Sequence, residues 1–271
     1  MISDIAFFRL IQVSINSKLF KMLIDLSPRI FFVEETKMRT SGKIKTEKSR
    51  EYIIFELTRK QSCGGGIAIG AHKDLNPVFI SEGNNETEVL VIEICLDEIS
   101  IRCAGAYGPQ ENDLVEKKSK FWSRLDQEVE KANVLEKGFI LQVDGNLHLG
   151  PEFLPNDPNN MNKNGKLFTE FLERNPHLIL VNSLDICRGL ITRRRKTVKK
   201  LEEAALDFFV ICNRVHQYLV KMVIDEEKKY VLTNYYQKDG KTIARDSDHL
   251  STLIYLNIKY SKNVQGRRKN V

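Results

Sequence analysis

The chain has 271 residues, of which 42% are hydrophobic and 29% charged, and its 42 Lys and Arg outnumber its 36 Asp and Glu by six. This composition is typical of a globular protein and excludes disordered, collagen-like and membrane-spanning chains. The densest apolar stretch, residues 89–99, is interrupted by Glu93 and Asp97, so no run reaches the roughly 18 apolar residues of a bilayer span. We expect one domain over residues 1–260 and a basic, disordered tail over residues 261–271.

The termini and cysteines indicate a cytosolic or nuclear protein. Asp4 stands where a signal peptide would carry Lys or Arg, and no small-residue cleavage site follows it. Five cysteines lie in or beside apolar stretches, without any CxxC spacing: Cys63, Cys95, Cys103, Cys187 and Cys212. We therefore expect reduced thiols in the core rather than disulfides or a zinc site.

The hydrophobic pattern predicts many strands and few helices. Apolar residues at helical spacing over 19–26 predict a helix that leads into a strand at 30–33, and the polar residues 36–51 predict a long exposed loop. Further helices are expected over 113–134 and 167–173, and further strands at 52–57, 65–70, 88–95, 100–106, 139–143, 178–181, 189–192, 206–211, 219–224, 229–233 and 250–257. This order favours an α/β fold with two packed sheets flanked by helices.

Two acidic clusters directly follow apolar strands. Glu35 follows the strand at 30–33, and its carboxylate is a ligand that suits Mg²⁺, although a lone Glu there is more often a solvated strand end. Asp144 and Asn146 flank Gly145 after the strand at 139–143, where a carboxylate and a carboxamide could orient a water and bind a phosphate oxygen. The alternative for this second cluster is an ordinary Asp-Gly turn.

Acidic residues also accompany a histidine near the C-terminus. Asp248 and His249 precede the last apolar strand, and a histidine cation held by a carboxylate could stabilise charge developing on phosphate oxygens. Asp207 lies within the apolar run 204–211, where an unpaired carboxylate is costly. The alternatives are a surface His beside an acid and an Asp that faces water.

Tyr107 ends another strand, at Tyr107-Gly108-Pro109, where its phenol could contact a phosphate or lie near a metal. The alternative is a strand followed by a turn. The glycines at 64–66 lack the Lys and Ser or Thr of a P-loop and indicate a flexible entry to the next strand.

The order of these motifs resembles that of the endonuclease/exonuclease/phosphatase superfamily, which includes DNase I and exonuclease III-type apurinic endonucleases. The motifs are FFVEETK, GGGIAIG, GAYGPQEN, LQVDGNLH, ALDFF and SDHLS, in that order. The sequence resembles most the endonuclease domain of non-LTR (LINE-type) retrotransposons, including the segment NGKLFTEFLERNPHLILVNS. The resemblance implies a four-layered, DNase I-like α/β sandwich with two mostly antiparallel sheets.

The resemblance also implies roles for individual residues. Glu35 and Asp248 would lie at the site of Mg²⁺, or of Mn²⁺, and Tyr107 would contact the scissile phosphate region. Asp144 would position or deprotonate the attacking water, supported by Asn146. Asp207 would orient His249, which would stabilise the pentacovalent phosphate. In related elements a reverse transcriptase domain accompanies the endonuclease, and none is recognised in this chain.

The first family motif, a strand bearing an Asn well upstream of the metal-binding Glu, has no match here. Residues 1–10 contain no Asn, and Asn16 lies only 19 positions before Glu35. We therefore expect the first core strand to be missing, rewritten or displaced, which affects activity more than fold. Val143 stands where the family has Gly, a smaller departure.

A dense run of cations, Arg193, Arg194, Arg195 and Lys196, predicts a loop that binds the DNA backbone, since phosphate neutralisation supplies most nonspecific DNA affinity. A solvated charge run and a nuclear localisation signal are the alternatives. The leading hypothesis is a Mg²⁺-dependent DNA endonuclease that nicks one strand. A phosphomonoesterase acting on inositol phosphates or nucleotides, and an inactive nucleic-acid-binding remnant, are the competing hypotheses.

Overall fold

The computed structural model describes residues 4–11, 25–36, 51–58, 65–84, 87–198, 200–230, 233–238 and 241–259. Its longer helices are α2 (Val115–Val134) and α3 (Lys163–Arg174), with the short α4 (Asn213–His216), η2 (Lys73–Leu75) and η3 (Val181–Ser183). The strands are β1 (Asp4–Ile11), β2 (Ile30–Glu34), β3 (Tyr52–Leu57), β4 (Ile67–His72), β5 (Val78–Glu82), β6 (Glu88–Cys95), β7 (Ser100–Tyr107), β8 (Gly138–Asp144), β9 (Leu178–Leu180), β10 (Cys187–Arg188), β11 (Arg193–Lys196), β12 (Leu201–Ala204), β13 (Asp207–Cys212), β14 (Leu219–Ile224), β15 (Thr233–Lys238), β16 (Lys241–Asp246) and β17 (Thr252–Asn257). Within these ranges no helix has the length and apolar character needed to cross a membrane.

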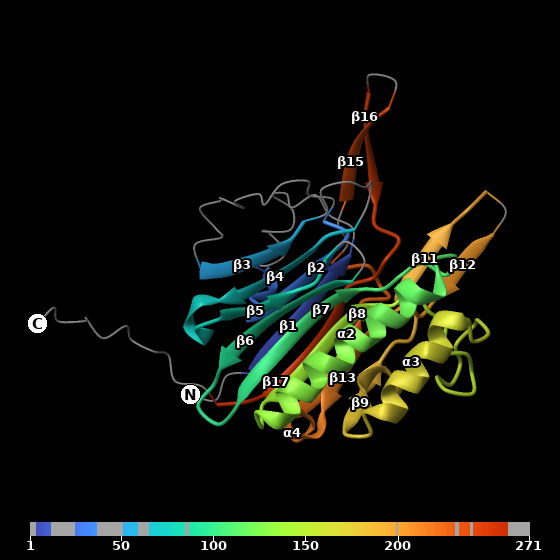
Figure 1. The fold of residues 1–271 in the computed structure, drawn as a ribbon. Coiled ribbons are helices and arrows are strands. Elements are labelled where there is room, and N and C mark those ends of the chain that lie inside the picture. Colours follow the sequence, from blue (N-terminus) through green and yellow to red (C-terminus); the bar gives the residue numbers. More distant parts are fainter. Residues whose placement is uncertain are drawn as a thin grey trace, which may run out of the picture.

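Two large sheets pack face to face (Figure 1). One has seven strands in the order β10-β14-β17-β1-β2-β4-β3, and the other has six in the order β5-β6-β7-β8-β13-β9. Their ladders are antiparallel except for the pairs β1–β2, β7–β8 and β10–β14. The predicted α/β sandwich with mostly antiparallel sheets is thus confirmed.

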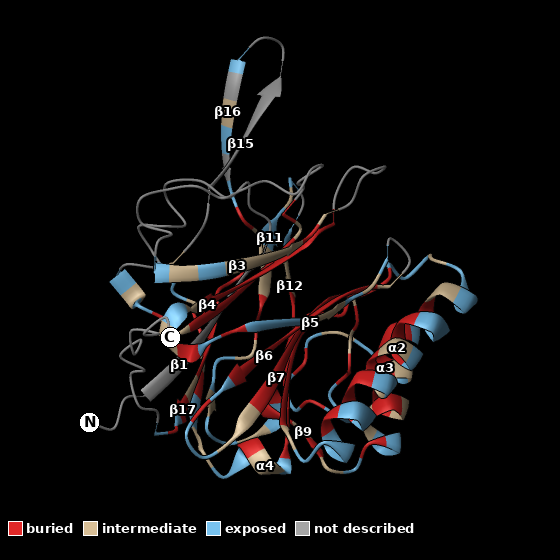
Figure 2. Ribbon diagram, turned by 60° about the vertical axis from the view of Figure 1, so that its left-hand side comes forward, coloured by how far each residue is buried: buried red, intermediate tan, exposed pale blue. Residues whose placement is uncertain are grey.

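Aromatic side chains fill the layers on both faces of the six-stranded sheet. Between the sheets, the rings of Phe32 and Phe209 meet edge to face with their centroids 6.1 Å apart. On the outer face, Trp122 of α2 packs against Phe168 and Phe171 of α3, and Phe168 in turn contacts Phe208 of the sheet. Figure 2 shows the buried residues in these interfaces. Removing such large apolar surfaces from water is the main force that holds the layers together.

The first strand of the fold is β1, at residues 4–11, where the sequence predicted a core strand that is missing, rewritten or displaced. β1 lies inside the seven-stranded sheet, antiparallel to β17 and parallel to β2, with Ile11 in register with Glu34. Its sequence, DIAFFRLI, is mostly apolar and aromatic apart from Asp4 and Arg9, which suits a strand in the middle of a sheet. What has changed is the side-chain chemistry of this strand, because none of its residues is Asn.

Several local predictions differ from the structure. Residues 189–192 form no strand because Glu226 Oε1 accepts the backbone N–H groups of Leu190 and Ile191 at 2.7 and 2.9 Å. The strand expected at 229–233 is replaced at its start by a turn, in which the carboxylate of Asp225 accepts the N–H groups of residues 229 and 230. Neither β5 nor the hairpins β11–β12 and β15–β16 were predicted.

Other expectations meet the structure only in part or lie outside the described residues. Cys103 and Cys212 are buried as predicted, but Cys187 is half-buried and Cys95 is exposed. The helix at 19–26, the loop at 36–51, Cys63 and the tail at 261–271 lie wholly or mostly outside the described residues.

Candidate active site

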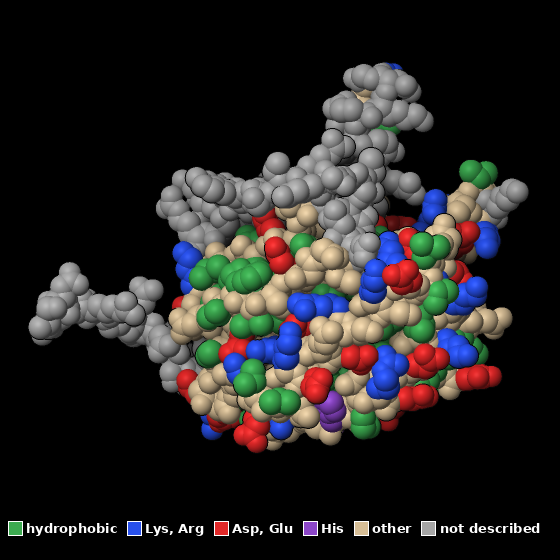
Figure 3. Space-filling view, viewed as in Figure 1, with side chains coloured by type: hydrophobic (Ala, Val, Ile, Leu, Met, Phe, Trp, Pro, Cys, Tyr) green, Lys and Arg blue, Asp and Glu red, His purple; other side chains and the backbone are tan. Residues whose placement is uncertain are grey.

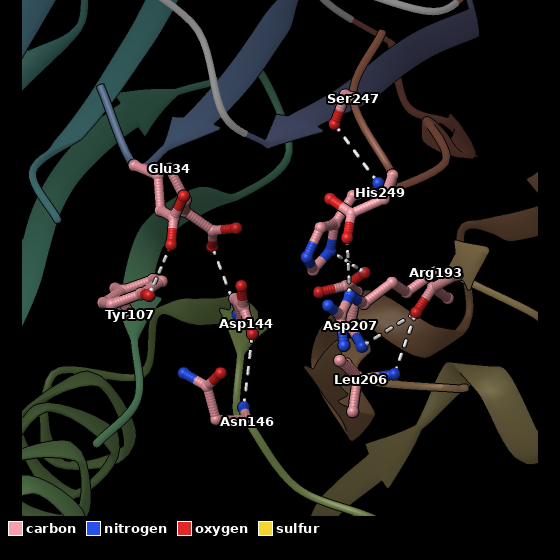
Figure 4. A network of polar contacts seen from close by, with 12 residues as sticks. Glu34, Tyr107, Asp144, Asn146, Arg193, Leu206, Asp207, Ser247 and His249 are labelled. Carbon is pink, nitrogen blue, oxygen red and sulfur yellow. Dashed lines mark hydrogen bonds and ion pairs between the residues drawn. The ribbon is translucent and has the colours of Figure 1, made fainter. Parts of the chain in front are cut away.

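Three of the predicted residues lie in one row across neighbouring strands. Tyr107 is in register with Asp144, and Asp144 is in register with Asp207. β7 and β8 run parallel and end at this edge, whereas the antiparallel β13 begins there, so their side chains meet although they are far apart in sequence. Figure 4 shows the group seen from close by.

Asp207 and His249 form a pair, as the resemblance implied. Nδ1 of His249 lies 3.0 Å from Oδ2 of Asp207, whose carboxylate is buried. Asp144 joins them, because one ligand atom from each of the three residues lies within 4.8 Å of the others. The carboxylate of Asp207, whose burial in an apolar strand is unfavourable without a partner, is therefore paired with His249. Asp144, Asp207 and His249 converge on one point.

Thr192 holds the strand that bears Asp207, a role that the sequence did not reveal. Its Oγ1 accepts the backbone N–H groups of Leu206 and Asp207 at 2.8 and 3.1 Å, and the residue is fully buried. Its carbonyl oxygen accepts the N–H of Leu250 at 2.6 Å. One residue thus connects the start of β13 with the segment that carries His249. Thr192 directly precedes the cation run, and no residue beside it in the sequence indicates this role.

Glu35 lies beside Tyr107 at the end of β2. The Tyr107 hydroxyl donates a 2.6 Å hydrogen bond to Oε1 of Glu35. Burial, together with the charges of Asp144 and Glu35, raises the pKa of the Tyr107 phenol well above its usual range. Glu35 has a φ of 49°, a left-handed conformation that is uncommon for this residue type and that often marks a functional site.

The adjacent Glu34 is a second acid that sequence reasoning did not single out. It is completely buried, and its Oε1 accepts the backbone N–H of Asp144 at 3.3 Å. The bond joins the two large sheets at the site, because Glu34 belongs to one and Asp144 to the other. Its position at the end of the buried run IFFVE was the available signal.

Asn146 is fixed in a tight turn after β8. Its backbone N–H donates to Oδ1 of Asp144 at 3.2 Å, and its Nδ2 donates to the carbonyl of Gly108 at 3.0 Å. A glycine is required at position 108, since a Cβ there would lie 2.8 Å from the carbonyl oxygen of Gly145. Asn164, another residue that the sequence analysis missed, donates to the carbonyls of Pro109 and Asn146 at 2.8 and 3.1 Å.

Asp248 lies next to His249 but does not belong to the convergent group. Its Oδ2 accepts a 3.0 Å hydrogen bond from Nε of Arg193. Burial alone would raise the pKa of Asp248, but the charges of His249 and Arg193 lower it below its usual value. Asp248, which was expected to bind metal, is thus paired with Arg193, which was expected to bind DNA.

The cation run forms a strand rather than the predicted loop. β11 pairs antiparallel with β12, with Arg193 opposite Ala204 and Lys196 opposite Leu201. Arg194 is used inside the protein, since its Nε donates to Glu203 at 2.7 Å and its Nη1 to the carbonyl of residue 226. Arg195 and Lys196 are exposed. On the face seen in Figure 3, Lys and Arg are interspersed with Asp and Glu. The exposed cations of the hairpin therefore form a local basic patch and not a positive potential over the whole face.

The donor atoms of the site suit a hard divalent cation. The carboxylates of Asp144 and Asp207, which converge with His249, and that of Glu35 beside Tyr107 are oxygen donors, which Mg²⁺ and Mn²⁺ prefer. The fixed cations near this edge, Arg193 and Arg194, are already paired with acids. Such a concentration of negative charge is a setting in which a divalent cation binds favourably.

A scan of the chain against protein-family models finds no match, and a search of the curated proteins finds no relative. Solved structures do match. The endonuclease domain of TRAS1, a telomere-specific non-LTR retrotransposon, superposes with a TM-score of 0.65 at 14% identity, covering 94% of this chain and 99% of that one. AP endonuclease LMAP from Leishmania major gives a TM-score of 0.69 at 13% identity, covering 94% and 88%. An AP endonuclease from Archaeoglobus fulgidus gives a TM-score of 0.66 at 15% identity, covering 94% of this chain and 100% of that one.

The chain has the DNase I-like fold. These proteins, like a Bacteroides thetaiotaomicron protein titled as a member of the endonuclease/exonuclease/phosphatase family, share that fold at identities of 11–15%. The fold suggested by six short motifs is thereby established for nearly the whole chain. Within this fold, Tyr107, Asp144, Asp207 and His249 lie at one edge of the central sheets.

Proposed function

We propose that this chain is a divalent-metal-dependent nuclease that hydrolyses phosphodiester bonds of DNA, nicks one strand and derives from a non-LTR retrotransposon. The observation that supports this most is the His249–Asp207 pair beside Asp144, with 3.0 Å between Nδ1 and Oδ2 in the pair. In-line attack on a phosphodiester needs a positioned water and positive charge near the phosphoryl oxygens. This group of side chains can supply both.

Each side chain has a definite task in this proposal. Asp144 orients the attacking water and accepts its proton, and His249, held by Asp207, stabilises the negative charge that develops on phosphorus oxygens. Tyr107 and Asn146 contact the phosphate from the other side of the site. A bound Mg²⁺ or Mn²⁺, held by Glu35 and the neighbouring carboxylates, would supply further charge neutralisation at the phosphoryl group.

The surroundings of the site favour DNA over a small phosphomonoester. The β11–β12 hairpin stands beside the site and exposes Arg195 and Lys196, which suit a phosphate backbone that extends beyond the reacting phosphate. An inositol phosphate or nucleotide would leave these cations unused. We place the protein in the nucleus or the cytoplasm.

Conversion of supercoiled plasmid to open circles in Mg²⁺ tests the proposal. Asp144→Ala and His249→Ala should each lower the nicking rate by about 10²–10⁴-fold, and EDTA should abolish nicking. Glu130→Ala and His216→Ala remove an acid and a histidine at exposed positions of α2 and α4, and these variants should nick normally.

Two results would contradict the proposal. A folded protein that binds DNA without nicking it would indicate an inactive remnant. Release of phosphate from inositol phosphates or nucleotides without plasmid nicking would indicate a phosphomonoesterase.

A further inference from the structure

The β15–β16 hairpin stands apart from the two large sheets. Its strands pair in register from Thr233 opposite Asp246 to Lys238 opposite Lys241, and they form a two-stranded sheet of their own. Figure 1 shows this ribbon projecting beyond the ends of the large sheets. It differs from the β11–β12 hairpin, which carries the cation run.

The base of the ribbon is anchored next to the candidate active site. Only Ser247 and Asp248 separate the end of β16 from His249, and the buried Ser247 accepts the backbone N–H of His249 at 3.2 Å. On the other side, the Ser251 hydroxyl donates to the carbonyl of Tyr230, shortly before β15, at 2.5 Å. The two chain segments that lead into and out of the ribbon are therefore held together beside the site.

Within the described part of the chain, the ribbon has few contacts with other elements that would stabilise it. No helix or strand there other than its own two strands packs extensively against it. An isolated two-stranded hairpin is at best marginally stable in water, because it has no hydrophobic face to bury. A partner that packs against both strands would supply the missing contacts.

The sequence of the ribbon suits nucleic acid. It contains the adjacent aromatics Tyr235 and Tyr236 and the cations Lys238, Lys241 and Arg245. Cations neutralise phosphates, and aromatic rings can stack on bases or contact base edges. The major groove of duplex DNA, about 12 Å wide, admits a two-stranded β-ribbon.

We propose that the β15–β16 ribbon lies in the major groove of duplex DNA next to the nicked phosphate and so selects where the chain cuts. The inference rests on the proposed nuclease function. Each strand has six residues, which at about 3.3 Å per residue gives a reach of about 20 Å. With about 3.4 Å between successive base pairs, the contacts should fall within about six base pairs on one side of the nick.

Three proteins provide the test. In the first variant, Asn-Gly replaces residues 236–243, which keeps the three register pairs nearest His249 and closes them with a favoured two-residue turn. The second is Lys238→Gln/Lys241→Gln, which keeps the ribbon. The matched control, Lys73→Gln/Lys259→Gln, removes two exposed cations, one in η2 and one beyond β17, at the opposite end of the sheets from the site.

Nick sites on a plasmid are mapped by sequencing, and Kd for a 30-base-pair duplex is measured over a salt series. We expect the shortened ribbon to reduce the preference among nick sites by about tenfold on one side of the nick. The lysine variant should weaken binding and lower the salt slope by about two, one for each lost phosphate contact. If the two ribbon variants have the same nick maps and salt slopes as the control, the inference is wrong, and the ribbon would instead bind a protein partner.

Binding separates this inference from the proposed function. If the wild-type chain does not nick, the proposed function fails, but the ribbon is still tested by comparing Kd of the three proteins for the duplex. Weaker binding by the ribbon variants alone would support the ribbon as a DNA-binding arm. Absence of any DNA binding by the wild-type chain would overturn both proposals.

Discussion

Arg193 and Asp248 tie the β11–β12 hairpin to the segment that carries His249. Nε of Arg193 lies 3.0 Å from Oδ2 of Asp248, and the backbones of Arg193 and His249 form an isolated antiparallel bridge. The N–H of Arg194 also donates to the carbonyl of Asp248 at 2.7 Å. A displacement of the hairpin by bound DNA would therefore act directly on the position of His249.

This coupling predicts different effects for two neighbouring arginines. Arg193→Gln should lower the nicking rate at saturating DNA by about tenfold, or about 1.4 kcal/mol of activation free energy, because it loosens Asp248 and His249. Arg195 is exposed, so Arg195→Gln should act mainly on Kd and lower the salt slope by about one. Single-turnover nicking and a salt titration measure the two effects. Equal losses of rate in both variants would show that Arg193 acts only through DNA affinity.

The sequence was sufficient to predict the fold and the sheet edge at which several of the candidate residues lie, because these depend on local patterns. Apolar runs that end in acids, such as the run before Glu34 and the run before Asp144, predicted both the strands and the edge at which the site lies. The pairing of Asp207 with His249 was implied by the family resemblance, and the structure shows it.

Other features depend on contacts between distant segments, which no local pattern specifies. The hydroxyl of Thr192 and the carboxylate of Glu34 each accept N–H groups from residues far along the chain, and nothing beside them in the sequence predicts this. The strand β1 lacks the Asn of the family motif, and the apolar content of its sequence was the signal available for it. For the β15–β16 hairpin a local signal did exist, since Asp239-Gly240 between two strand-like runs is typical of a two-residue hairpin turn.

Thr192 should be essential for the position of Asp207. Thr192→Val keeps the shape of the side chain but leaves the buried N–H groups of Leu206 and Asp207 without their acceptor. We expect the free energy of unfolding to fall by about 2–4 kcal/mol, since each unsatisfied buried donor costs about 1–3 kcal/mol. Urea unfolding measures this loss, and Thr192→Ser, which retains the hydroxyl, should recover most of it. If Thr192→Ser is as unstable as Thr192→Val, packing of the methyl group rather than hydrogen bonding is responsible.

Tyr107 should act as a neutral hydrogen-bond donor at every working pH. Its pKa is raised above the ordinary value of 10.0, first by burial and then by the charges of Asp144 and Glu35, so the phenol keeps its proton. Tyr107→Phe removes the 2.6 Å bond to Glu35, and we expect about a tenfold lower nicking rate. The shape of the pH–rate profile below pH 10 should be the same in both proteins. An alkaline limb that disappears in Tyr107→Phe would show that the phenol ionises in this range.

His148 should make the folded state sensitive to mild acid. Burial lowers its pKa below the ordinary value of 6.5, against the opposing charges of Asp157 and Glu111 and with a smaller contribution from Arg193. Its Nδ1 has no hydrogen-bond partner among the described residues. A histidine with a depressed pKa binds a proton more readily in the unfolded chain, so the free energy of unfolding must fall as the pH drops below 6.5 towards the folded-state pKa. Urea unfolding at pH 7.5 and pH 5.5 should therefore show a smaller loss for His148→Gln than for the wild type, while the exposed control His216→Gln should behave like the wild type. Parallel losses in all three proteins would mean that other groups cause the acid sensitivity.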